Sequence, residues 1–327
     1  MAGHCICVFQ MCTLLVCGSA HANAILEPPV IAAEPVPELL DVVDAPRDFL
    51  SEKIVDFSKR MDRFFGDERY FQENNKSVIQ LDFNQTIEQS GNRIFKFEGK
   101  AKLDLPAAQK RFQLVLEVNP EKKAAGEVNK NQPVNTTLPS TTTPDKYAAS
   151  FRFEESEESN WHFSSETGIK VELPLDPFVR TRGRYSIPLG EWRLSFTESL
   201  FWFGTIGLGE TTQIELERVL SKPVLFRATS TATCMETTQI CDMRQDLALF
   251  HTVDDRNALL YQVSAIGSNK PVMQETAFVL LLKYRYRMHR EWVFFEAIPQ
   301  LNFPRTDGFK LNASLLLRLE VLFGATR

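Results

Sequence analysis

Beyond its N-terminal segment, the chain lacks any apolar run long enough to form a transmembrane helix. Its mean hydropathy is -0.20, although 43% of its residues are hydrophobic. No membrane-spanning helix is therefore expected beyond the N-terminal segment. Membrane β-strands escape this test, because they alternate lipid-facing and lumen-facing residues and average near neutral hydropathy.

The chain also lacks a block of basic residues standing clear of acids, and its formal net charge is -5. This balance argues against a nucleic-acid partner. The five His residues show no metal-ligand spacing, and no glycine loop of the phosphate-binding kind is visible. We therefore predict no metal and no cofactor. The sequence is rich in Phe, with 25 Phe against only 15 Gly. This composition suits a protein whose outer surface faces lipid.

Residues 1–24 have the pattern of a secretory signal peptide. The stretch from Cys5 to Val16 is mostly apolar, and Ala20-His21-Ala22 and Ala22-Asn23-Ala24 both fit cleavage sites. An uncleaved anchor or a misassigned start is the alternative. The pattern predicts export, and with the strands below it predicts location in a bacterial outer membrane.

Cysteine is scarce after this segment, because four of the six cysteines lie within it. Cys234 and Cys241 remain, on either side of a short turn. In an oxidising compartment such a pair predicts one disulfide. The loop that it closes is short, so the expected stabilisation is about 2 kcal/mol.

The next segments differ in character. Residues 25–46 are rich in Pro, Ala and acidic residues, which indicates an extended linker. Residues 47–72 have a helical period, with Leu50, Ile54, Phe57, Met61 and Phe64 on one face. We predict a short amphipathic periplasmic helix, docked on its own barrel or rim. A plug in the lumen and a partner-binding helix remain as alternatives.

From residue 76 the hydrophobic period becomes two. Ile79, Leu81 and Phe83, for example, alternate with Gln80 and Asp82. Such segments recur at about 76–88, 92–105, 110–119, 146–155, 160–173, 176–187, 191–203, 208–220, 223–234, 240–252, 256–267, 276–288, 291–302 and 310–323. Many reach the roughly ten residues that a tilted membrane strand needs. The pattern predicts an all-β fold, a transmembrane antiparallel β-barrel of about 14 (12–14) strands over residues 76–323, preceded by the short helix.

The connections give an independent test of this strand count. If the first strand runs outward, the periplasmic connections include 221–222, 253–255 and 289–290, which are tight. The opposite connections include the longer 120–145, 268–275 and 303–309 segments. Short turns inside and longer loops outside are typical of bacterial barrels. Trp161 and Trp192 follow tight turns on the apolar face, where an interfacial girdle is expected.

The final strand is strongly amphipathic and ends on the aromatic Phe323. It resembles the carboxy-terminal signal by which the barrel-assembly machinery recognises bacterial outer-membrane proteins. The segment from Asp62 to Arg69, and Leu103-Asp104-Leu105-Pro106 with Lys110-Arg111, resemble a family of proteobacterial porin-like barrel proteins. The resemblance covers most of residues 60–323 and implies a barrel, but no established activity.

Charged residues of both signs alternate with the apolar face and are predicted to line the lumen. The principal candidates are Arg180, Arg182, Arg184, Lys283, Arg285, Arg287, Glu166, Glu172 and Glu296. Arg180, Arg182 and Arg184 form a ladder at period two that resembles the arginine ladder at porin constrictions. Structural ion pairing, including pairing with Glu166 and Glu172, and a role in anion passage both remain open.

One polar residue breaks the apolar face. Glu198 lies among Leu194, Phe196 and Leu200, where a carboxylate would face hydrocarbon. A β-bulge, a subunit contact or a wrongly assigned register would each explain it.

No catalytic residues are predicted. His162 and Ser164 share a strand face, in a superficial resemblance to outer-membrane phospholipase A, but they fall on the presumed lumen side. The favoured function is a passive or weakly selective channel. The alternative is a non-conducting scaffold or docking barrel, and a lipid-modifying enzyme is the least favoured. Expected partners are outer-membrane lipids, the barrel-assembly machinery and a second copy of the chain; the solute stays open.

Overall fold

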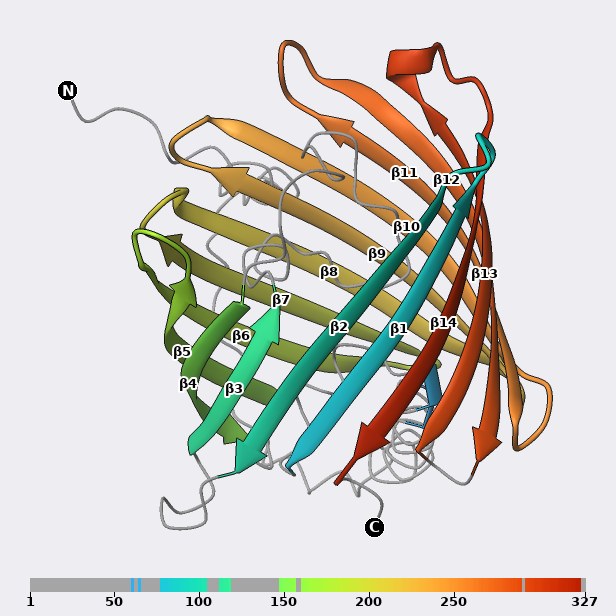
Figure 1. Cartoon of the computed structure of the whole chain (residues 1–327), viewed down its shortest axis with the longest axis horizontal. Coiled ribbons are helices and arrows are strands. Elements are labelled where there is room, and N and C mark those ends of the chain that lie inside the picture. Colours follow the sequence, from blue (N-terminus) through green and yellow to red (C-terminus); the bar gives the residue numbers. More distant parts are fainter. Residues whose placement is uncertain are drawn as a thin grey trace, which may run out of the picture. The chain divides into compact units, whose positions relative to one another are not determined.

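The computed structural model describes residues 60–61, 64–65, 77–104, 112–118, 147–156, 160–289 and 292–324. Over these ranges, fourteen antiparallel strands form one closed barrel, in which each strand pairs with its neighbours in sequence (Figure 1). The strands are β1 (Val78–Glu88), β2 (Arg93–Asp104), β3 (Phe112–Val118), β4 (Tyr147–Ser156), β5 (Trp161–Val171), β6 (Asp176–Leu189), β7 (Trp192–Phe203), β8 (Gly207–Ser221), β9 (Val224–Met235), β10 (Ile240–Thr252), β11 (Asn257–Ser268), β12 (Gln274–His289), β13 (Val293–Pro304) and β14 (Asn312–Phe323). The predicted fold class and strand number are confirmed.

The barrel closes between the first and last strands, which lie side by side in Figure 1. Ile79 pairs with Phe323 at one end of this seam, and Glu88 pairs with Ser314 at the other. The seam between β2 and β3 is much shorter, with pairing from Ala101 to Asp104 of β2 in the described residues. Closure removes the free strand edges that an open sheet would present to lipid.

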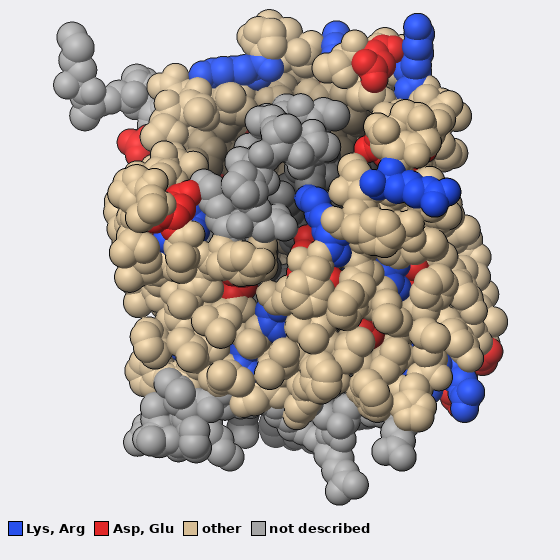
Figure 2. Space-filling view, viewed as in Figure 1, with Lys and Arg blue, Asp and Glu red and all other residues tan. Residues whose placement is uncertain are grey.

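The two faces of the strands differ as the alternation predicts. In β1, Gln80, Asp82 and Asn84 point inward and are buried, whereas Ile79 and Phe83 point outward and are exposed. Figure 2 shows this side of the barrel as mostly uncharged, with the largest Lys, Arg, Asp and Glu patches along the upper margin and at the lower right and smaller ones between. An apolar band between polar margins is what a bilayer-spanning barrel presents to lipid.

Glu198 places a carboxylate on the outward face of β7, and two of the three explanations for it are wrong. The register runs without a shift through β6–β7 and β7–β8, so neither a bulge nor a wrong register turns this side chain outward. Glu198 accepts a hydrogen bond from the hydroxyl of Thr212 on the neighbouring strand, at 2.8 Å. A subunit contact is the explanation that remains.

We call the end of the barrel with turns 190–191, 222–223 and 253–256 the tight-turn end, and the end with connections 89–92, 269–273 and 305–311 the loop end. The predicted segments 1–24, 25–46 and 120–145 lie outside the described residues. Of the predicted helix 47–72, the structure describes Arg60, Met61, Phe64 and Phe65, which have helical backbone. In the described part of the chain, no helix is long and apolar enough to cross a membrane.

Candidate functional site: the barrel interior

The arginine ladder of β6 lies opposite β5 and is tied into a buried ionic network. Arg180 pairs with Glu166 on β5 at 2.8 Å and with Glu117 on β3 at 3.2 Å. Glu166 also binds Arg152 of β4 at 2.9 Å and accepts a hydrogen bond from Ser150. Charge-assisted contacts of this kind fix the guanidinium groups against the wall.

The network continues from the same ladder towards β9. Arg184 reaches past β7 to Glu215 on β8, at 3.2 Å. Arg227 of β9 lies 3.7 Å from Glu215 and 2.5 Å from Glu217, which also pairs with Arg193 of β7. Each of these arginines therefore pairs with a glutamate that also binds a second arginine. Among the residues described, this part of the wall has no large excess of positive or negative charge.

A second ionic network covers the wall from β12 to β14. Glu296 of β13 pairs with Lys283 at 2.8 Å, with Arg318 of β14 at 3.1 Å, and with Arg285. Arg285 also binds Glu320 of β14 at 2.6 Å. Arg285 and Glu296 are both 0% exposed, so these charges stabilise one another away from water.

Two candidate residues lie at the margins of the interior. Glu172 follows the end of β5 at the loop end and pairs with Lys170 at 3.2 Å. The pairing of β5 with β6 places Glu166 opposite Arg180 and ends with Lys170 opposite Asp176, so Glu172 lies beyond the stretch of β5 that faces the ladder. Arg287 lies near the end of β12 and is only half-buried; its guanidinium donates to the backbone carbonyl of Asp255 in the tight turn.

Part of the inner wall is apolar, which the alternation pattern did not lead us to expect. Inward residues of β9 to β13 form a continuous cluster at and above the tight-turn end, which we call the inner apolar belt: Leu225, Ala248, Phe250, Ala258, Leu260, Leu281 and Ile298. Met61 and Phe65 belong to the same cluster and are 2% and 4% exposed. The helical residues therefore lie against the inside of the barrel wall.

The loop end has its own packed cluster. Phe178, Phe201 and Phe203 pack together on inward positions of β6 and β7. Beside them Lys170 pairs with Asp176 at 2.7 Å. The backbone N–H and hydroxyl of Thr205 also donate to Asp176, which ties the turn after β7 to the start of β6.

His162 and Ser164 of β5 both point into the barrel. His162 lies 3.3 Å from Glu154 of β4, and Ser164 is directly opposite Glu154 in the register. Within the described ranges, His162 forms no hydrogen bond with Ser164. No group of three or more His, Cys, Asp or Glu there could hold a metal ion.

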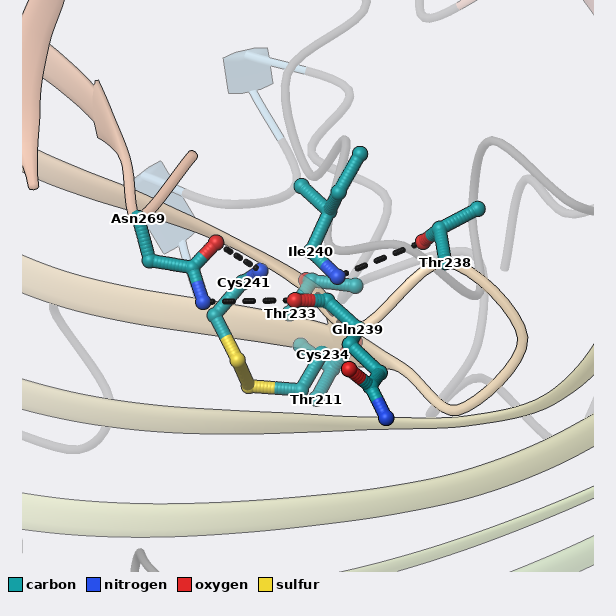
Figure 3. Close-up of a disulfide and its surroundings, with 8 residues drawn as sticks. All are labelled: Thr211, Thr233, Cys234, Thr238, Gln239, Ile240, Cys241 and Asn269. Atoms are coloured by element: carbon teal, nitrogen blue, oxygen red, sulfur yellow. Dashed lines mark hydrogen bonds between the residues drawn. A yellow bond between two sulfur atoms is a disulfide. The ribbon is translucent and has the colours of Figure 1, made fainter. Parts of the chain in front are cut away.

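Cys234 and Cys241 form a disulfide across the turn between β9 and β10. The two residues are directly opposite in the register, with Cα atoms 4.1 Å apart. Figure 3 shows Asn269 beside the bridge, its side-chain oxygen accepting the backbone N–H of Cys241 at 2.9 Å. The backbone N–H of Asn269 in turn donates to the carbonyl of Cys241. The polar groups of Cys241 thus point towards β11, which makes the bridged pair the closely spaced, non-hydrogen-bonded kind.

No protein-family model matches the sequence, and no curated protein matches it. Solved structures of barrel proteins do. A loop-deletion mutant of OmpT, an outer-membrane protein of Vibrio cholerae, is 8% identical with a TM-score of 0.51, covering 76% of this chain and 98% of its own. The outer-membrane channel DcaP of Acinetobacter baumannii is 9% identical (TM-score 0.41; 76% and 96% covered), and the KdgM porin is 6% identical (TM-score 0.35; 74% and 98%). Identities this low show the fold alone: this chain has the architecture of outer-membrane β-barrels.

Proposed function

We propose that the protein is a passive or weakly selective channel of the bacterial outer membrane, for small polar or charged solutes. The observation that carries this proposal is the concentration of paired Lys, Arg and Glu on inward positions, while outward positions are mainly apolar. Charges placed inside a membrane barrel mark the pathways of ions and solutes, because hydrocarbon excludes them elsewhere.

The pairing of these charges favours weak selectivity over strong selectivity. Arg180 and Arg184 each lie within 3.2 Å of a glutamate. A passing anion would meet a guanidinium whose field is already balanced by a carboxylate.

The test is the reversal potential of the refolded full chain in a planar bilayer under a KCl gradient. Replacing Arg180, Arg182 and Arg184 with Ser leaves Glu166 and Glu215 without these partners, so we expect a shift towards cations. The matched control is Arg218→Ser, since Arg218 pairs with Glu191 outside the barrel interior. An unchanged reversal potential in a conducting, heat-modifiable triple variant contradicts the assignment.

A non-conducting scaffold is the second candidate, and the burial of the interior favours it. Arg285, Glu296 and Glu217 are each 0% exposed, so water does not reach them in this conformation. Absence of conductance under every condition, with folding intact, would select the scaffold. A lipid-modifying enzyme has less support, because His162 and Ser164 point away from the lipid. We also propose that β14, through Phe323, is recognised by the barrel-assembly machinery.

A further inference from the structure

The inner apolar belt has no place in an open, water-filled lumen. Inward residues of such a lumen are normally polar, and apolar side chains exposed to water there are unfavourable. Yet Leu225, Phe250 and Leu260 lie directly opposite one another across β9, β10 and β11, and Lys283 of β12 continues the row. A row of apolar side chains of this kind requires an apolar occupant.

The structure supplies that occupant from the same chain. Met61 and Phe65 are one helical turn apart and therefore share a face. The ring of Phe65 packs edge-on against Phe250, with centroids 5.2 Å apart. Phe64 packs against Phe294 at 6.1 Å, and the hydroxyl of Thr252 lies 3.2 Å from the sulfur of Met61.

The same segment is bonded to the second ionic network. The ammonium of Lys283 donates to the backbone carbonyl of Phe65 at 3.1 Å, and it pairs with Glu296 at 2.8 Å. It also lies 5.6 Å from the centroid of the Phe65 ring, a cation–π distance. One lysine thus joins the helical residues to the charges that line the proposed pathway.

We propose that the segment carrying Met61, Phe64 and Phe65 is an internal stopper, which docks on the inner apolar belt and holds the channel closed until it is displaced. The inference rests on the proposed channel function and adds its regulation. Displacement leaves the wall intact, because the strand pairing that closes the barrel runs from β1 to β14 without this segment. It exposes the belt to water, so the open state is the minor one.

The first experiment compares two aromatic-to-alanine variants of the full chain in planar bilayers. Phe65→Ala removes a docked ring, whereas Phe151→Ala removes a ring from the lipid-facing surface, where Phe151 is 57% exposed. We expect the open fraction of Phe65→Ala to rise roughly tenfold, the shift that loss of one buried aromatic gives a two-state equilibrium. Phe151→Ala should behave as the wild type. A conducting Phe65→Ala with an unchanged open fraction overturns the stopper, and Met61→Ala repeats the test if Phe65→Ala does not fold.

The second experiment locks the segment in place. Cysteines at Phe64 and Phe294 are joined by a short, cleavable thiol cross-linker. We expect the cross-linked protein to stay closed and to regain conductance on cleavage, with wild type treated in the same way as the control for the native disulfide. Undiminished conductance in the cross-linked form overturns the proposal.

A third measurement separates failure of the stopper from failure of the channel. Leu260→Cys places a thiol in the belt, where Leu260 is 2% exposed. Alkylation of this thiol, followed by peptide mass mapping, should be slow in the single variant and much faster when Phe65→Ala is added. If the rates differ but no variant conducts, the docking stands and the channel function is wrong. Equal rates overturn the docking itself.

Discussion

Glu296→Gln is expected to lower the free energy of unfolding of the barrel by about 3–5 kcal/mol, the usual cost of removing one partner from a buried ion pair. Glu296 lies between Lys283, Arg285 and Arg318, and all of these side chains are at most 4% exposed. After the substitution Arg285 keeps Glu320 at 2.6 Å. Lys283 keeps no carboxylate partner among the described residues, so an ammonium is left buried and unbalanced.

The matched control is the Arg218–Glu191 pair at the tight-turn end. Its side chains are 37% and 64% exposed, so water screens the attraction. Glu191→Gln should cost no more than about 1 kcal/mol. Both substitutions remove one partner of an ion pair, so the difference between their effects on the free energy of unfolding reports the effect of burial.

The assay is denaturant unfolding of the refolded full chain in detergent, followed by tryptophan fluorescence and by heat-modifiable gel migration. A Glu296→Gln, Lys283→Met double variant should recover much of the loss, because it also removes the ammonium that Glu296→Gln leaves buried without a carboxylate. If Glu296→Gln costs as little as Glu191→Gln, the second ionic network does not stabilise the fold and the reasoning is refuted.

Three further predictions concern the disulfide, one tight turn and Glu198. Replacing Cys234 and Cys241 with Ser should lower the free energy of unfolding by about 2 kcal/mol, as the chain entropy of a short loop gives, measured by the same unfolding assay. The backbone N–H of Arg256 and the side chain of Asn257 hold the pKa of Asp254 below its usual value. The turn should therefore lose stability only as pH falls through that lowered pKa. We expect this loss as faster proteolytic cleavage of the turn at low pH. The Asp254→Ala variant should show the faster cleavage already at neutral pH. If Glu198 is a subunit contact, Glu198→Leu should reduce chemical cross-linking between copies in liposomes; undiminished cross-linking rules that contact out.

The barrel itself could be predicted from sequence because a strand has only two faces. Once Ile79, Leu81 and Phe83 are assigned to lipid, Gln80 and Asp82 must point inward, and tight turns such as 221–222 fix the register of the next strand. Partner choice within the lumen could not be predicted in this way. Arg184 binds Glu215, two strands away, because a long side chain crosses the intervening strand; spacing along one strand contains no information on that reach.

The inner apolar belt was missed for a different reason, although its signal is present. In β10, Leu247, Ala248, Leu249 and Phe250 are apolar on both faces, which departs from the alternation of a lipid–water strand. Such a run indicates that the inward face is also covered by apolar groups. Leu225 and Leu260, inward on the neighbouring strands, repeat the departure. These runs were therefore a signal in the sequence that part of the inner wall is apolar.

The chemistry of the interior explains how a short apolar segment can rest inside a charged lumen. Lys283, Arg285, Arg318, Glu296 and Glu320 balance one another, so the segment need not supply charges of its own. The ammonium of Lys283 can still donate a hydrogen bond, and the backbone carbonyl of Phe65 accepts it. Because the charges of the second ionic network balance one another, the apolar side chains of Met61 and Phe65 can pack beside them.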